Sequence, residues 1–385
     1  MLHAVLIGCA TYSAVCFVLV LVNLAALPRL AREAPASSDL PLPSVSIVVP
    51  ARNEERAIGP ALASLLAQDY PSLEIVVVDD RSTDGTRAVL AAFSDDPRLS
   101  IVDGAEPPPG WLGKPHALFQ GSGKARGEIL FFIDADVRYG PRAVSKAVAF
   151  LLRQRADFVA LLPRIETRGF WEGVLMPNLV CALFFGPSFL ANAPWPRWLA
   201  AGGGAGNLIR RSAYDALGGH EALRNSVIDD VRLAFTAKQA GFATRVVLAH
   251  DLVAVRMYHG FREVWGGFTK NIAYALGGWT GVAFAAISVA WTMVAVFPPV
   301  LLAAALFGAS IRPQDAALAG LSAGLLLLAR LVMSAALRDP LWPAFTTPLM
   351  TAVWAALLGR SVYQRLVRRT VPWRGREFDA TKAGF

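Results

Sequence analysis

The sequence predicts an α/β domain with a largely parallel sheet, held in a membrane by apolar helices at both ends. From Val45 onward, short apolar runs that suit buried strands alternate with amphipathic helical runs. This β-α-β-α-β order favours parallel strands with right-handed crossovers. Long apolar runs flank the region and make the chain 55% hydrophobic and only 17% charged, which is too apolar for an ordinary soluble protein. We therefore expect a transmembrane anchor at 1–28, a linker at 29–44, the α/β domain at 45–276, transmembrane helices at 277–359 and a basic tail at 360–385.

The first apolar run, Leu2–Leu27, is uncharged apart from His3 and is long enough to span a bilayer. The alternative is a cleaved signal peptide, because 34–36 resembles a cleavage site. The run has no basic segment before it and is too long for a signal peptide, so we expect an uncleaved anchor. Arg29 and Arg32 follow it, which predicts that the central domain is cytoplasmic.

The distribution of charge argues against a nucleic-acid-binding protein, and the cysteines argue against a disulfide-rich or cysteine-metal protein. A net charge of +8 would suit nucleic acid, but the arginines bracket the apolar runs, so we expect a membrane surface and no nucleic-acid partner. Cys9, Cys16 and Cys181 make neither a disulfide framework nor a metal-ligand spacing.

Acidic residues follow successive predicted strands. The expected strands are Val45–Pro50, Leu73–Val78, Leu99–Val102, Ile129–Ile133, Asp157–Leu162 and Leu208–Ile209. Glu54, the pair Asp79-Asp80, and Asp134 with Asp136 lie where strands end. Such crowding is costly unless a cation or hydrogen-bond donors bind there, and carboxylate oxygens suit Mg²⁺ or Mn²⁺ carrying a phosphate. The alternative is strand-end turns and helix caps. No G-x-G-x-x-G follows the first strand, which argues against a dinucleotide fold of the usual kind.

Two further segments have alternative interpretations. Phe170–Leu190 is apolar but contains Pro177 and Pro187, so it is either an interfacial, acceptor-lining segment or a core helix. The glycine-rich run 201–207 lets a substrate approach the backbone closely, or is a plain flexible loop.

The C-terminal third contains three apolar runs, Gly281–Ala309, Ala316–Leu337 and Leu341–Leu358. Three complete spans from a cytoplasmic domain would leave the arginine-rich tail outside, against the usual charge rule. Either the first run forms two half-spans hinged at Pro298-Pro299, or one segment is re-entrant.

Several motifs together resemble family 2 glycosyltransferases of the GT-A fold. They are VSIVVPARNEE, EIVVVDDRSTDGT, GWLGKPHAL, FFIDAD and VIDDVRLA, between Val45 and Leu276. The segment RMYHGFREVWGGFTKN is most similar to lipid-directed membrane members, such as the ceramide glucosyltransferases and the bacterial hopanoid- and carotenoid-associated enzymes. The resemblance implies a Rossmann-like mixed sheet and inverting transfer from a nucleotide sugar, usually UDP-linked, to a membrane lipid. It implies an integral protein of a bacterial inner membrane.

The resemblance also assigns roles to residues. It implies a nucleotide-sugar site made of Pro50, Arg52, Glu54, Asp79, Asp80, Lys114 and Asp134. Asp136 and Asp134 are expected to hold the metal, without His or Cys ligands. Lys114 would face the base or the diphosphate, and a solvated surface lysine is the alternative.

One general base on the acceptor hydroxyl is enough for a single displacement. The resemblance makes Asp230 that base, with Asp229 in reserve, while a helix cap is the alternative. The candidates for the acceptor or diphosphate side are Gly203, Gly204, Arg262, Trp265, Trp373 and Arg374. Processive relatives carry Q/R-x-x-R-W, but Val264 precedes Trp265 here. This departure counts against a processive polysaccharide synthase, which remains an alternative together with a non-catalytic membrane scaffold.

Overall fold

The computed structural model describes residues 1–35, 42–275, 278–373 and 376–379. The chain divides into two compact units. The sheet unit contains Leu27–Glu166 and Leu190–Met257, and the helical unit contains Met1–Ala26, Thr167–Phe189 and Tyr258–Phe385. Residues 167–189 and 258–276, inside the range that the sequence assigns to the α/β domain, thus group with the apolar helices.

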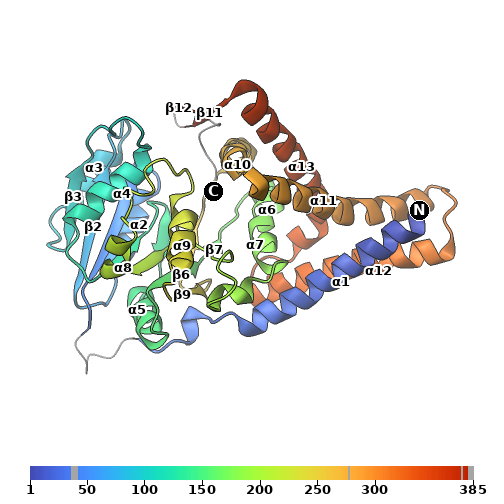
Figure 1. The fold of residues 1–385 in the computed structure, drawn as a ribbon, viewed down its shortest axis with the longest axis horizontal. Helices are drawn as coiled ribbons and strands as arrows, with labels where there is room; N and C mark the ends of the chain where they lie inside the picture. The colour runs from blue at the N-terminus through green and yellow to red at the C-terminus, as the bar shows by residue number, and fades with distance from the viewer. Residues whose placement is uncertain (36–41, 276–277, 374–375, 380–385) are drawn as a thin grey trace. The chain divides into compact units, whose positions relative to one another are not determined.

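The sheet unit is built on a seven-stranded mixed sheet (Figure 1). Across the sheet its strands are β3 (Leu99–Asp103), β2 (Leu73–Asp79), β1 (Val45–Ala51), β4 (Ile129–Phe132), β8 (Asn207–Arg210), β6 (Phe158–Leu162) and β9 (Thr244–Leu248). The first four are parallel, as predicted. Strand β8 lies between β4 and β6 and is antiparallel to both, which makes the sheet mixed.

Helices cover both faces because the central strands are apolar on both sides. In β4, Ile129 and Phe131 belong to one hydrophobic core and Leu130 and Phe132 to the other, as the two-residue period of a strand requires. The helices of the first core are α2 (Ile58–Leu66), α3 (Thr86–Ala91) and α5 (Ala143–Arg153). Those of the second are α4 (Gly113–Lys124), α8 (Arg211–Ala216) and α9 (Asp229–Gln239).

The register aligns the carboxyl ends of the first strands. Ala51 of β1 lies opposite Asp79 of β2, which lies opposite Asp103 of β3. A three-stranded sheet then follows Asp134-Ala135-Asp136, with strands β5 (Val137–Tyr139), β10 (Val253–Val255) and β7 (Arg164–Ile165). The acidic residues at the strand ends therefore lie on the same side of the large sheet, beyond the carboxyl ends of its parallel strands.

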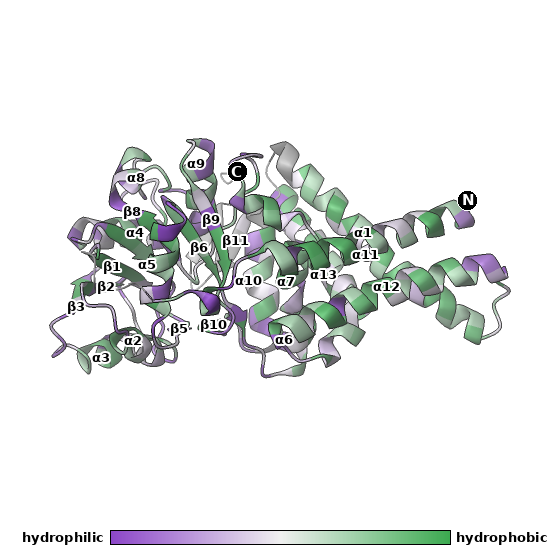
Figure 2. Cartoon of the chain, turned by 90° about the horizontal axis from the view of Figure 1, so that it is seen from below, coloured by the Kyte–Doolittle hydropathy of each residue, from purple (hydrophilic) through white to green (hydrophobic). Residues whose placement is uncertain are grey.

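Among the described residues of the helical unit, three helices are long and apolar enough to cross a membrane: α1 (Leu2–Ala26), α11 (Gly278–Leu306) and α12 (Pro313–Leu337). Hydrophobic residues predominate along all three (Figure 2). Helices α1 and α12 run in the same direction, because His3 pairs with Asp315 at 2.7 Å and Ser13 with Ser322 at 3.0 Å. Helix α11 continues through Pro298 and Pro299, which counts against the alternative of two half-spans hinged there.

The last apolar run is not one long helix. It is divided into a 3₁₀ turn, η3 (Trp342–Thr346), and a 17-residue helix, α13 (Thr347–Tyr363), whereas a span needs about 20 residues. A π-helical turn, η4 (Gln364–Arg368), and a hairpin of β11 (Thr370–Trp373) and β12 (Arg376–Asp379) follow. The structure therefore favours the re-entrant alternative over three complete C-terminal spans.

Shorter elements pack around these helices in the helical unit. They are α6 (Phe170–Leu175), α7 (Pro177–Phe184) and α10 (Gly260–Ala275). Arg330 of α12 is fully buried among them: it donates to Cys181 Sγ at 2.6 Å and to the Pro343 carbonyl at 3.2 Å. These partners satisfy part of the hydrogen-bonding capacity of an arginine inside an apolar run. The sheet unit also has a 3₁₀ turn, η1 (Leu30–Arg32), and η2 (Ser188–Asn192) joins the two units.

Candidate active site

A pocket lies in the sheet unit beyond the carboxyl end of β4. Its lining is Lys114, Leu118, Phe132, Ile133, Asp134, Gly204, Asn207, His220, Asp229, Asp230 and Leu233. Asp134 follows β4, Lys114 is in the first turn of α4, and Asp229 and Asp230 begin α9. Four of the residues singled out by their motifs are therefore brought together by three different elements.

Lys114 lies between the carboxylates of this pocket. Its Nζ is 2.7 Å from Asp134 Oδ1 and 3.7 Å from Asp229 Oδ1. Burial alone would lower the pKa of Lys114, but Asp134, Asp229 and Asp230 together raise that pKa well above its ordinary value. The ammonium group is thus held charged as the counter-ion of the acidic cluster.

Asp229 and Asp230 are adjacent, yet their pKa values move in opposite directions. Asp229 is 2% exposed; burial raises its pKa, but Lys114 and then His220 outweigh this effect and lower it. For Asp230, burial raises the pKa to about 6, with Asp229 and Asp134 adding to the rise and Lys114 opposing it. Such a separation gives two neighbouring carboxyl groups different tasks.

Asp136 does not line this pocket, but the charges of Asp134 and Lys114 also act on its carboxyl group. Burial, and then the charges of Asp134 and Glu54, raise the pKa of Asp136 to about 7. The predicted crowding of strand-end acids is therefore present between these three residues. A divalent cation would relieve it, and Asp134 with Asp136 would offer the hard oxygen ligands that such ions prefer. Within the described ranges, no group of three or more His, Cys, Asp or Glu side chains is arranged to hold a metal.

The glycine-rich run packs tightly against the acids. A Cβ on Gly204 would lie 1.9 Å from Asp134 Oδ2, and one on Gly202 would lie 2.4 Å from the Asp230 carbonyl oxygen. The Gly204 carbonyl accepts a 2.7 Å hydrogen bond from the Asp134 amide. Gly203, in contrast, has open space where a Cβ would be. Gly202 and Gly204 thus permit close contact, which a plain flexible loop would not need.

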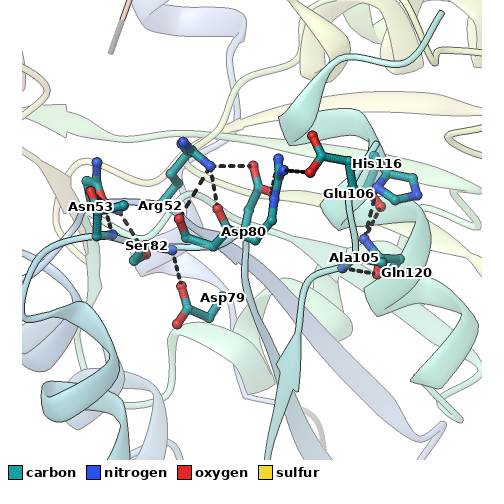
Figure 3. A network of polar contacts seen from close by, with 11 residues as sticks. Arg52, Asn53, Asp79, Asp80, Ser82, Ala105, Glu106, His116 and Gln120 are labelled. Carbon is teal, nitrogen blue, oxygen red and sulfur yellow. Dashed lines mark hydrogen bonds and ion pairs between the residues drawn. The ribbon is translucent and has the colours of Figure 1, made fainter. Parts of the chain in front are cut away.

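A second polar network follows β1 and β2 (Figure 3). Asp80 is 5% exposed, and its carbonyl accepts a 2.6 Å hydrogen bond from Arg52 Nη1. Arg81 donates to Asp80 Oδ1 at 3.2 Å and pairs with Glu106 at 2.8 Å. The structure therefore brings Arg52 and Asp80 together.

The other residues expected near the nucleotide make local contacts. Asp79 Oδ1 accepts a 3.1 Å bond from the Ser82 amide, which is the turn-capping contact considered as the alternative. The Glu54 amide donates to Thr86 Oγ1 at 2.7 Å. Pro50 lies in β1 next to the Arg52 turn.

Three candidates lie in the helical unit. Arg262 and Trp265 lie on α10 of the helical unit, with the Trp265 ring 5.4 Å from that of Phe261. Val264 is fully buried, so an apolar core residue stands where the processive motif has arginine. Trp373 is in β11; its side chain and Arg374 lie outside the described residues.

Sequence reasoning missed His220. Its side chain is 1% exposed: Nδ1 is 2.8 Å from the Tyr214 hydroxyl, and Nε2 is 3.8 Å from Asp229 Oδ2. Tyr214 is in turn 3.0 Å from Ser122 Oγ. His220 follows a glycine pair with no spacing that links it to Asp229, so only the tertiary contact could have identified it.

The mixed sheet, with acids at the carboxyl ends of its strands, is of the GT-A type. Residues 46–218 match the family model described as Glycosyl transferase family 2. The chain therefore contains a family 2 glycosyltransferase domain.

Two curated relatives have the same name, 4,4'-diaponeurosporenoate glycosyltransferase, and come from Staphylococcus aureus. The protein of strain MRSA252 is 29% identical over 240 residues, which are 61% of this chain and 62% of the relative. That of strain USA300 is 28% identical, with the same coverage. The match thus spans 62% of the length of these relatives.

A solved structure with the same fold is the mannosyltransferase PcManGT from Pyrobaculum calidifontis, in complex with GDP-Man and Mn²⁺. The superposition has a TM-score of 0.56 at 21% sequence identity. It covers 96% of this chain and 100% of the other. At this identity the likeness establishes the fold.

Proposed function

We propose that this protein is an inverting glycosyltransferase that moves a sugar from a nucleotide sugar, most simply a UDP-sugar, to a membrane lipid. The observation that carries the proposal is the pocket in which Lys114 contacts Asp134 and Asp229 beside Asp230. The family 2 domain supports the reaction class. The relatives named for a carotenoid acid support a lipid acceptor.

Asp230 is our candidate for the general base. A pKa of about 6 leaves it ionised at neutral pH, yet basic enough to accept the proton of an acceptor hydroxyl. Asp229, whose pKa is lowered, stays charged and holds Lys114 in place. The acceptor hydroxyl, losing its proton to this one base, attacks the anomeric carbon from the face opposite the leaving diphosphate and so gives inversion, whereas retaining glycosidases need a second carboxylate as nucleophile.

The departing nucleoside diphosphate needs positive charge. Lys114 supplies a point charge of the kind that binds phosphate. Asp134 and Asp136 would hold a divalent metal, Mg²⁺ or Mn²⁺, and such an ion would stabilise charge on the leaving diphosphate. The Mn²⁺ in the solved mannosyltransferase supports the choice of a divalent metal.

The nucleoside would bind at the network in Figure 3. We assign Asp80 to accept hydrogen bonds from the uracil or ribose, with Arg52 holding its carbonyl. Pro50, Glu54 and Asp79 would border this site. On the acceptor side we retain Gly203, Gly204, Arg262, Trp265, Trp373 and Arg374.

The membrane assignment rests on α1, α11 and α12. If each crosses once, residues 27–277 and the arginine-rich end of the chain lie on the same side, which the charge rule makes cytoplasmic. We therefore propose a bacterial inner-membrane protein with a cytoplasmic transferase domain. The boundaries 1–28, 29–44, 45–276, 277–359 and 360–385 remain our functional division of the chain.

The test is transfer of radiolabelled sugar from a panel of nucleotide sugars by membranes that contain the full chain, with Mg²⁺ or Mn²⁺. We expect label in the organic phase, and loss of that label with Asp230→Asn. Label in a large water-soluble polymer would instead identify a synthase. An absence of transfer from every donor, with an acceptor-containing lipid extract supplied, would support a scaffold.

A further inference from the structure

Two tryptophans of the sheet unit project into solvent from one short loop. Trp195 is 76% exposed and Trp198 is 63% exposed, whereas Pro196 between them is buried. Arg197 is also exposed. We call Ala193–Leu199 the tryptophan loop. Large aromatic residues are usually at least half-buried in a soluble protein, so two on one loop mark a surface that meets an apolar partner.

The loop is fixed at both ends by one lysine. Lys238 of α9 is 2% exposed, and its Nζ donates to the Ala191 carbonyl at 2.8 Å and to the Leu199 carbonyl at 2.6 Å. Just before the loop, Asn192 forms hydrogen bonds with both the amide and the carbonyl of Val246 in β9, at 2.5 and 3.1 Å. The tryptophans are therefore presented by an ordered loop.

The segment that follows α1 and the segment that enters the tryptophan loop both attach to β9. Helix α1 ends at Ala26, and the carbonyl of Pro28 accepts a 2.8 Å hydrogen bond from the Leu248 amide of β9. Leu248 is two residues from Val246, to which Asn192 is bonded. The chain that leaves the apolar helix and the chain that enters the tryptophan loop thus attach to the same edge strand.

A second contact lies within the helical unit, just before the chain passes to the tryptophan loop. The Phe189 amide donates a 2.8 Å hydrogen bond to Asn23 Oδ1, in the last turn of α1. Trp195 follows Phe189 by six residues, which reach about 20 Å at most. The length of this connection therefore limits how far Trp195 can lie from the residue bonded to the last turn of α1.

We infer that the tryptophan loop is a membrane contact: Trp195 and Trp198 enter the boundary between headgroups and acyl chains, and Arg197 faces anionic headgroups. Tryptophan has an apolar ring and one N–H donor, and it concentrates at this level of a bilayer. A nearby arginine gains from a negatively charged leaflet. The inference rests on the membrane placement of α1 in the proposed function and is independent of sugar transfer.

The test uses the full chain in vesicles of phosphatidylcholine and phosphatidylglycerol. Trp198→Cys is labelled with an NBD fluorophore, then exposed either to phosphatidylcholine bearing a shallow doxyl quencher or to aqueous iodide. The native Cys9, Cys16 and Cys181 are buried, and unmodified protein measures their background labelling. Asp95→Cys is the matched control, because it is exposed and precedes β3 at the opposite edge of the large sheet.

We expect doxyl lipid to quench the probe at 198 at least about twofold more than the probe at 95, and iodide to show the reverse order. Equal quenching at both positions would overturn the inference. Protection of the probe at 198 from both quenchers would also overturn it, because a second copy of the chain would then cover the loop. If Trp198→Cys does not fold, Arg197→Cys provides the same measurement. Lipid quenching needs no sugar donor, so its result is separate from that of the transfer assay.

Discussion

Lys114, whose side chain is 36% exposed, and the buried Lys238 are two lysines of the sheet unit with opposite surroundings. Lys114 faces carboxylates, which raise its pKa well above the ordinary value although burial opposes them. Lys238 donates to backbone carbonyls, and burial, then Arg245, lower its pKa. Carbonyl dipoles satisfy an ammonium without fixing its charge, whereas carboxylates fix it. The carbonyl partners of Lys238 suit the structural anchoring of a loop. The carboxylate partners of Lys114 suit the electrostatic stabilisation of a substrate.

The largest effect is expected from the acid beside Lys114. Asp230→Asn should reduce sugar transfer by about 10²- to 10⁴-fold, the usual contribution of a general base. Its thermal midpoint should be unchanged or slightly higher, because a crowded carboxylate has been removed. Transfer rates and a melting curve of the same preparation check this. Asp230→Glu, which keeps a carboxyl group, should recover part of the rate; full activity of Asp230→Asn would reject the assignment.

Replacing Lys114 by Met removes the charge but keeps an unbranched chain of similar length. We expect transfer to fall by about 10²-fold, because charge stabilisation at the diphosphate is lost. Lys114→Arg should retain more activity than Lys114→Met. Comparable activity of the wild type and Lys114→Met would show that the lysine only neutralises its neighbours.

Two adjacent glycines test the packing around the same acids. Gly204→Ala should destabilise the protein by about 1–3 kcal/mol through overpacking and should also displace Asp134. Gly203→Ala is the matched control: it has room for a methyl group and should change stability by less than about 0.5 kcal/mol. Denaturation and transfer are measured for both. Equal behaviour of the two variants would contradict the close contact at Gly204.

The carbonyl-bound lysine should matter for stability and not for chemistry. Lys238→Met leaves buried carbonyls without their donor, which should cost about 1–3 kcal/mol of unfolding free energy. Lys146, half-buried with one bond of 2.7 Å to the Ala31 carbonyl, supplies a milder control, with about 0.5–1.5 kcal/mol expected for Lys146→Met. A large loss of sugar transfer by folded Lys238→Met would contradict the purely structural role assigned to this lysine.

The pH profile should give the smallest but most diagnostic effect. With the Asp230 pKa raised to about 6, kcat/KM should rise with pH through about 6 and level off above it. Stability should move in the opposite direction: this group's contribution is fully present below its unfolded pKa, about 4, and is lost as pH rises through 6.

Lys114 lowers the Asp230 pKa, so Lys114→Met should move this limb of the profile to higher pH. The same variant leaves Asp229 and Asp134, which raise the pKa, in place. If the rise of kcat/KM in Lys114→Met occurs at the same pH as in the wild type, Lys114 does not influence the group whose ionisation controls the rate.

The sequence was most informative where a local pattern carried the signal. An apolar strand running into Asp134 and Asp136 predicted acids at a sheet edge, and their shared electrostatics in the structure follow from that pattern. Helix α9 begins with Asp229 and Asp230, and acids in a first turn are favoured by the helix dipole.

Other features depended on distant partners and gave no local signal. Nothing in the sequence links His220 to Asp229, or Lys238 to Leu199, before the chain folds. The two half-spans considered for 281–309 failed for a related reason: prolines in an apolar helix are tolerated when neighbouring elements satisfy the freed backbone groups, and composition alone does not reveal those neighbours.

The parallel pairing of α1 with α12 has a consequence for biosynthesis. Ser13 and His3 emerge from the ribosome first, but their partners Ser322 and Asp315 are made about 310 residues later. Until then, His3 and Ser13 lack these two partners on α12. Truncation before Pro313 should therefore leave the first helix inserted but without its partner α12 and exposed to quality-control proteases, even though the sheet unit is already complete on the ribosome.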